Sequence, residues 1–304
     1  PGKEIVMESY LMKNSTRGKA HKKRGKKNED YIIAKRIDVD KILIIAADGV
    51  SACLYGGRAS KLVVKCFYTF VRDELKKCKN EEEIRNVFLN ASDKTLLCLK
   101  EVANRKGGIR EWGTTLEVGF FCNNGEVYYL HCGDGAIMSL TKDGFVYLTN
   151  NELHKTEGML HSVVPFSEKN SWEFGKFKDK SLGMVVMTDG VYEFIRPLGI
   201  RNYGYEYEPA IFIPVIDRRC HLNSKNNHYE YINKLFNGVI NDREAIEKLK
   251  IIQKESNREL IEGYEVDCKM LQDSKLVSRY ESMINDDMTI GIFLNDYPKE
   301  YKDI

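Results

Sequence analysis

The chain has 304 residues, of which 42% are hydrophobic and 30% are charged, and its formal net charge at pH 7 is +2. This composition is typical of a folded globular protein, and the charge argues neither for nor against nucleic acid. No stretch reaches the roughly 20 apolar residues that a membrane-spanning helix needs. The eight cysteines form no CxxC pair and no Cys/His ligand spacing, which argues against structural zinc and indicates a reducing, cytoplasmic compartment.

The first part of the chain predicts one strand and one basic loop. A strand is expected from Ile5 to Met12. Residues 13–27 then contain eight lysines and arginines, no acidic residue and two glycines, which predicts a mobile loop. The commonest role of such a loop is a solvated surface. A nucleic-acid arm and a lining for the approach of an anionic substrate are the two alternatives.

Two strands and two long helices follow. The strands are expected at Tyr31–Lys35 and Lys41–Ala47. Apolar residues recur at helical spacing from Gly56 to Lys79, which predicts the first helix. Asn80 caps a second helix with an acidic first turn, and the Gly107-Gly108 pair ends it.

The rest of the chain predicts mostly strands, joined by short turns. Asn123-Asn124-Gly125 and Lys142-Asp143-Gly144 have the composition of hairpin turns. Residues 196–283 give a weaker pattern, with one helix expected from Asn241 to about Glu262. Strands are expected at Thr115–Cys122, Glu126–His131, Ala136–Thr141, Phe145–Leu148, Met184–Thr188 and Thr289–Leu294.

Acidic residues stand at the ends of five of these strands. Each Asp-Gly pair alone is a common turn, and Asp143-Gly144 is interpreted in that way. Five such clusters are harder to explain as turns. If they converge, their charge requires hard cations, and ligation by oxygen alone suits magnesium or manganese. The clusters are Asn28-Glu29-Asp30, Asp48-Gly49, Asp134-Gly135, Asp189-Gly190 and Asp286-Asp287.

Six short motifs occur in a fixed order along about 260 residues, and together they are far more specific than any one alone. They are Asn28-Glu29-Asp30, Ala47-Asp48-Gly49, Gly113-Thr114-Thr115, Gly133-Asp134-Gly135, Thr188-Asp189-Gly190 and Asp286-Asp287-Met288-Thr289. In this order they resemble the metal-dependent protein serine/threonine phosphatases, the protein phosphatase 2C or PPM-type family, in a bacterial-like form.

The resemblance implies an α+β fold, with a central β-sandwich of two antiparallel sheets flanked by pairs of helices in α-β-β-α layers. It also implies a single domain over residues 1–304 with a divergent insertion at about 196–283. The expected protein is a cytoplasmic monomer that binds neither nucleic acid nor membrane. Its expected partners are phosphoprotein substrates of a serine/threonine kinase.

The same resemblance assigns the metal ligands. It implies that Asp48 bridges two Mn²⁺ or Mg²⁺ ions and that the Gly49 carbonyl binds one of them. Asp189 and Asp286 would hold the first ion, and these three aspartates would be the catalytic residues. Glu29 would belong to the second ion, with Asp30 close by through water.

A third, weaker metal site in the family matches Asp134 and Glu193. Many members have an aspartate at the second of these positions, so the longer side chain is a departure. Asp287 occupies a position that is usually asparagine, and we expect it to support the ligands rather than bind an ion.

Two further departures concern the substrate. The family arginine that grips the phosphate corresponds to Gly25, so Arg24 and Lys27, or Lys26, are the candidates to replace it. The histidine that some members carry after the first Asp-Gly, a proposed general acid, corresponds to Val50.

The function implied is hydrolysis of phosphoserine and phosphothreonine by a hydroxide that bridges two metal ions, with no phosphoenzyme. Such a pair of ions lowers the pKa of the water and neutralises the phosphoryl oxygens. One alternative is a catalytically weak or inactive regulatory or binding protein on the same fold, which the missing arginine favours. Another is a hydrolase of small phosphoesters.

Overall fold

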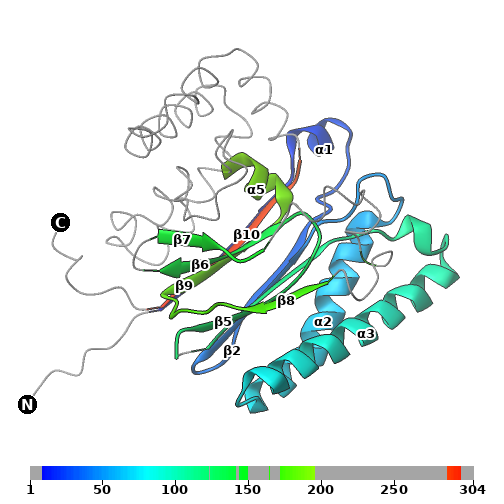
Figure 1. Ribbon diagram of the computed structural model, residues 1–304. Helices are drawn as coiled ribbons and strands as arrows, with labels where there is room; N and C mark the ends of the chain where they lie inside the picture. Colours follow the sequence, from blue (N-terminus) through cyan, green and yellow to red (C-terminus); the bar gives the residue numbers. More distant parts are fainter. Residues whose placement is uncertain are drawn as a thin grey trace, which may run out of the picture.

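The computed structural model describes residues 9–122, 124–141, 144–149, 164, 172–195 and 286–295. The part of the expected first strand before residue 9, the 196–283 insertion and its predicted helix lie outside these residues. The described chain forms two five-stranded antiparallel sheets that pack face to face, with two long helices on the outer face of one sheet (Figure 1). The predicted α+β class with a two-sheet sandwich is therefore confirmed.

The first sheet has the strand order β1-β10-β9-β6-β7. It joins segments that are far apart in sequence, since β1 pairs with β10 along its full length, from Tyr10 opposite Leu294 to Thr16 opposite Met288. The strands are β1 (Tyr10–Thr16), β10 (Met288–Leu294), β9 (Gly183–Met187), β6 (Ala136–Thr141) and β7 (Gly144–Tyr147).

The second sheet has the strand order β2-β3-β4-β5-β8. Its first four strands are consecutive antiparallel neighbours, and Tyr31 at the start of β2 pairs with Ala47 at the end of β3. The strands are β2 (Tyr31–Asp38), β3 (Lys41–Ala47), β4 (Leu116–Cys122), β5 (Glu126–Cys132) and β8 (Glu173–Lys176).

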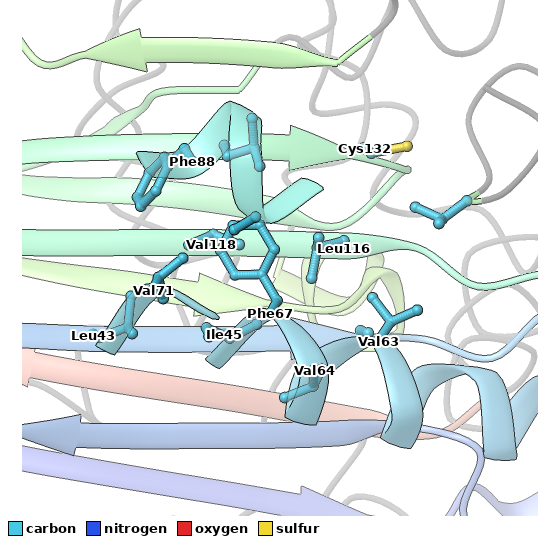
Figure 2. Close-up of a cluster of buried hydrophobic side chains, with 14 of the residues drawn as sticks. Leu43, Ile45, Val63, Val64, Phe67, Val71, Phe88, Leu116, Val118 and Cys132 are labelled. Carbon is cyan, nitrogen blue, oxygen red and sulfur yellow. The ribbon is translucent and has the colours of Figure 1, made fainter. Parts of the chain in front are cut away.

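Helices α2 (Gly56–Lys77) and α3 (Glu81–Arg105) cover the outer face of the second sheet. The Asn80 side chain accepts a hydrogen bond from the Glu83 amide, so it is the predicted N-cap. Phe67 and Phe88 from the two helices are fully buried, with ring centroids 5.9 Å apart. In Figure 2, Phe67 lies over β3 and β4, and Phe88 lies further across the sheet toward β5. The helical apolar stripes are therefore core faces.

A second core lies between the two sheets. Successive residues of β3 alternate between the cores, because side chains of a strand point to opposite faces. Leu43 and Ile45 face the helices, whereas Ile42 and Ile44 face the other sheet. Phe121 of β4 packs on Phe293 of β10 with ring centroids 4.7 Å apart, which joins the two sheets.

Four local expectations need correction. The first strand runs further than predicted, to Thr16, so Lys13 lies in β1 and not in a loop, because β10 supplies its hydrogen-bonding partner. Part of the basic run forms a short helix, α1 (Lys19–Lys23). The edge strand β8 was missed, since its Glu-Phe-Gly-Lys sequence has little strand signal. Asp189 opens another short helix, α5 (Asp189–Ile195). A 3-10 turn at Ile109–Glu111 follows α3.

Candidate metal centre

The predicted acidic strand ends meet at one end of the sandwich. Antiparallel pairing places the start of one strand beside the end of its neighbour. Asp30 precedes β2 while Asp48 follows β3, and Asp286 precedes β10 while Asp189 follows β9. Asp134 lies in the turn between β5 and β6, and Ala136 at the start of β6 pairs with Met187 at the end of β9. Both sheets thus contribute carboxylates to a single cluster.

The Gly113-Thr114-Thr115 motif fixes the backbone of Asp48. The Asp48 carbonyl accepts hydrogen bonds from the Thr115 amide (2.8 Å) and the Thr114 hydroxyl (2.6 Å). The Asp48 amide donates to the Thr115 hydroxyl at 3.0 Å. With its backbone groups satisfied in this way, Asp48 is held rigidly and its side chain alone faces the cluster.

Asp30 is the most deeply placed aspartate of the cluster. It is buried, and its Oδ2 atom accepts a hydrogen bond from the Thr188 hydroxyl at 2.8 Å. The charge of Asp287 acts on Asp30, and the charge of Asp30 acts on Asp48. Burial raises the pKa of both groups well above the ordinary aspartate value, because two adjacent carboxylates in a low dielectric cannot both ionise without a cation.

Asp189 and Asp286 belong to the same electrostatic unit. Burial raises the pKa of Asp189, and the negative charges of Asp134, Asp48 and Asp286 raise it further. Burial also raises the pKa of Asp286. Together with Asp30 and Asp48, these side chains form a concentration of negative charge that is strongly unfavourable in the absence of metal.

Close backbone approach explains the glycines of the motifs. A side-chain carbon on Gly49 would lie 2.3 Å from the Gly56 carbonyl carbon. A side-chain carbon on Gly190 would lie 1.9 Å from the Asp287 carbonyl oxygen. Neither residue has a positive φ. The glycines are therefore required for packing of the loops that carry Asp48 and Asp189, and not for an unusual backbone conformation.

Asp287 ties the start of the chain to the cluster, and its charge acts on both Asp30 and Asp286. Its Oδ1 atom accepts from the Gly18 amide at 2.7 Å, and its Oδ2 atom accepts from the Glu29 amide. The Nδ1 atom of His21 lies 2.9 Å from Asp287 Oδ2. These contacts agree with the expected supporting role.

Two residues of the site were missed in the sequence. His21 lies among the lysines and arginines of residues 13–27, and nothing in that context indicated a role. The residue is buried, and its Nε2 atom lies 3.1 Å from the Ser51 hydroxyl and 3.4 Å from Glu29 Oε2. Glu117 lies within an apolar strand and is fully buried beside the cluster. A glutamate between Leu116 and Val118, on the face of β4 that meets the other sheet, was the available signal.

The basic residues near the site differ in placement. The Lys26 ammonium lies 3.2 Å from Glu29 Oε2 and donates to the Ser51 carbonyl at 3.1 Å. Arg24 and Lys27, the first candidates for binding phosphate, are exposed. Lys26 is therefore the cation that directly contacts a predicted metal ligand.

The predicted third-site residues are only partly described. Asp134 is exposed, and its charge acts on both Asp189 and Asp48. Glu193 lies in α5, but its side chain is outside the described part of the structure. His131, the last residue of the expected strand Glu126–His131, is buried in β5.

The donor set fits a hard divalent cation. Three buried carboxylate oxygens, Asp30 Oδ1, Asp189 Oδ1 and Glu117 Oε1, have no hydrogen-bond partner. Uncompensated buried oxygens of this kind are satisfied by Mg²⁺ or Mn²⁺. Within the described residues no three acidic, histidine or cysteine side chains already converge at metal-binding distance. The carboxylates are thus gathered by the fold, and the final coordination geometry would form on binding.

Comparison with known families identifies the class of protein. The profile of the protein phosphatase 2C family matches residues 17–245, which is most of the chain. The chain belongs to this family and is a protein serine/threonine phosphatase that acts on phosphoprotein substrates, and phosphatases of this type use Mn²⁺ or Mg²⁺. A comparison with curated protein sequences gave no match.

Solved structures support the fold. The serine/threonine phosphatase PstP/Ppp of Mycobacterium tuberculosis is similar with a TM-score of 0.54 and 12% identity, covering 96% of this chain and 100% of that one. The PstP catalytic domain in complex with two manganese ions gives a TM-score of 0.55, 12% identity and the same coverage. PppA of Pseudomonas aeruginosa gives 0.52 and 12%, covering 94% and 97%. Among the described helices, none is long and apolar enough to cross a membrane.

Proposed function

We propose that this chain hydrolyses phosphoserine and phosphothreonine in proteins with two Mn²⁺ or Mg²⁺ ions held by the carboxylates at the end of the sandwich. The observation that carries the proposal is the gathering of Asp30, Asp48, Asp189 and Asp286, from four strand ends, into one cluster in which Asp30 is buried and the other three are half-buried. These carboxylates repel one another, and a site with only a structural role would not require that repulsion.

We assign the residues as follows. The charges of Asp30, Asp286 and Asp134 all act on Asp48, which would bridge the ions, with the Gly49 carbonyl binding one of them. Asp189 and Asp286 would hold one ion, and Glu29 with Asp30 would hold the other. When bound, the ions would supply an activated water and neutralise the phosphoryl oxygens.

The protein itself contributes rigidity and positive charge. The threonines that fix the Asp48 backbone keep its carboxylate in place as the substrate arrives. Lys26, on the loop that also carries Arg24 and Lys27, places an ammonium group next to Glu29. We propose that this loop takes the substrate phosphate in place of the family arginine, with Lys26 as its innermost cation. We also propose that the whole chain is one domain, with residues 196–283 as an insertion.

The test is hydrolysis of a phosphothreonine peptide and of a small aryl phosphate with manganese, magnesium or chelator. Wild type should be active only with metal, and Asp48→Asn should lose about a thousandfold or more in kcat/KM, because the bridging charge is removed. Asp38→Asn, at the other end of the β2-β3 hairpin, is the matched control and should retain activity.

Other outcomes would be informative. Manganese binding by calorimetry without turnover would contradict the hydrolase and leave a phosphate-sensing protein on this fold. Turnover of the aryl phosphate but not of the peptide would instead indicate a small-molecule phosphoesterase.

A further inference from the structure

Glu117 is the one carboxylate of the cluster that none of the family motifs contains. It lies on β4 between two residues that face the helices, so its own side chain points into the layer between the sheets. It is fully buried. A glutamate in such a place is rare unless something compensates its charge.

The contacts of Glu117 place its carboxylate beside the candidate metal centre. Its Oε2 atom accepts a hydrogen bond from the Thr115 hydroxyl at 3.2 Å, and Thr115 in turn holds Asp48. Asp134 lies between two glycines, and their lack of side chains leaves room for Glu117. A side-chain carbon would lie 2.7 Å from Glu117 Oε1 if placed on Gly135, and 3.0 Å from the same atom if placed on Gly133. Glu117 thus packs directly under the turn that carries Asp134.

The other oxygen of Glu117 is not satisfied. Oε1 is buried and has no hydrogen-bond partner. An ionised carboxylate in that position costs several kcal/mol unless a cation or proton compensates it. The nearest charges, those of Asp134, Asp48 and Asp189, are all negative and increase this cost.

His131 is the other residue that could compensate Glu117. It is buried and lies directly opposite Glu117 in the register between β4 and β5. The Nδ1 atom of His131 lies 3.6 Å from Glu173 Oε2. An experiment on Glu117 must therefore distinguish a cation from a histidine.

We propose that Glu117 is an additional metal ligand of this chain, and that its carboxylate binds a divalent cation, Mn²⁺ or Mg²⁺, together with Asp134 and Asp189. The inference rests on the proposed two-metal function and adds Glu117, which none of the family motifs contains, to the third ion site that the family resemblance matches to Asp134. Because Glu117 is buried and Asp134 exposed, the cation would lie between the interior and the solvent side.

The experiment compares wild type with Glu117→Gln, which has the same shape but no charge. Manganese binding is measured by calorimetry and thermal unfolding is measured in chelator and in manganese. The variant should bind one ion fewer per chain, or bind one ion about tenfold more weakly. In chelator it should unfold at a higher temperature than wild type, because the unpaired buried charge is gone, and manganese should raise its Tm less.

The matched control is Glu126→Gln, the same substitution at the opposite end of the neighbouring strand β5, where Glu126 pairs with Lys176. It should leave the manganese count unchanged. Glu117→Asp keeps the charge but withdraws it by one methylene, and it should retain the ion with at least threefold weaker affinity. It provides the answer if Glu117→Gln does not fold.

Three results would overturn the inference. An unchanged ion count and affinity in Glu117→Gln would do so, as would a lower Tm in chelator with unchanged manganese binding, which would assign the charge compensation to His131. If Glu117→Gln does not fold, unchanged affinity in Glu117→Asp would also overturn it. The proposed function fails separately, since wild type would then bind no manganese or show no metal-dependent turnover.

Discussion

The two faces of the sheet β2-β3-β4-β5-β8 are both buried, but they serve different purposes. The face under α2 and α3 is covered by apolar side chains, such as Phe67, Phe88 and Leu116 (Figure 2). The face that meets the other sheet is apolar in its middle and carries Glu117 and His131 toward one end. The comparison teaches that one face provides stability and that the other face can then tolerate unfavourable buried charge at the site.

The largest change in stability should follow removal of metal from the carboxylate cluster at the end of the sandwich. Burial raises the pKa of Asp30, Asp48, Glu117 and Asp189, so the folded protein without metal binds more protons than the unfolded chain. Their stabilising contribution is complete below the unfolded pKa values near 4 and is lost as pH rises through the raised values.

We therefore expect the Tm in chelator to fall as pH rises above the unfolded pKa values near 4, and manganese to restore it most at the highest pH. Scanning calorimetry with and without metal tests this. A Tm that is independent of pH in chelator would mean that the carboxylates are not packed as described.

The next effect belongs to the helix-facing core. Phe88→Ala removes a fully buried ring that packs on Phe67 and Phe174, and it should lower the free energy of unfolding by about 3–5 kcal/mol. The loss should be the same in manganese and in chelator, measured by denaturant unfolding. The exposed Leu89→Ala, one residue further along α3, is the control and should change stability little.

A metal-dependent loss in Phe88→Ala would contradict the separation of the two faces. It would show that packing under the helices and the charge of the site are energetically coupled.

The smallest effect on stability is expected at His21, which joins the charged end to the first residues of the chain. His21→Ala removes the contacts with Asp287 and Ser51 and should cost about 1–3 kcal/mol. Because Glu29 would lose a neighbour that orients it, manganese affinity should fall about tenfold or more. Lys23→Ala, an exposed position on the same short helix, is the control.

Calorimetric titration and unfolding of the two variants measure these effects. Equal manganese affinity in His21→Ala and wild type would show that His21 only packs beneath the loop.

The sequence allowed much of the fold to be predicted because the strands and helices follow strong local patterns. The apolar run that ends at Ala47 and the stripe on α2 carry their own periodicity. Prediction from the sequence failed at β8, whose four residues form a strand only because they pair with the edge of β5. It also failed at the end of β1, which continues to Thr16 because it pairs with β10 about 280 residues away in sequence.

For the site, the residues that belong to short motifs were found and the isolated ones were not. Asp48, Asp189 and Asp286 stand beside glycines and strands in a recognisable order, and the structure gathers them, although their roles as ligands stay predictions. His21 and Glu117 have no such context, since a histidine among lysines and a glutamate in an apolar strand have no function that local sequence can indicate.

The sequence by itself determined the class of fold, the acidic strand ends and the need for a cation, because alternation, turn residues and charge are local properties. Only the tertiary structure decided which charges share one buried volume. It placed Asp287 against the Gly18 and Glu29 amides and placed Glu117 beneath Asp134. These neighbours come from strands far apart in the chain, and the cost of burying charge depends on the whole environment that those strands create.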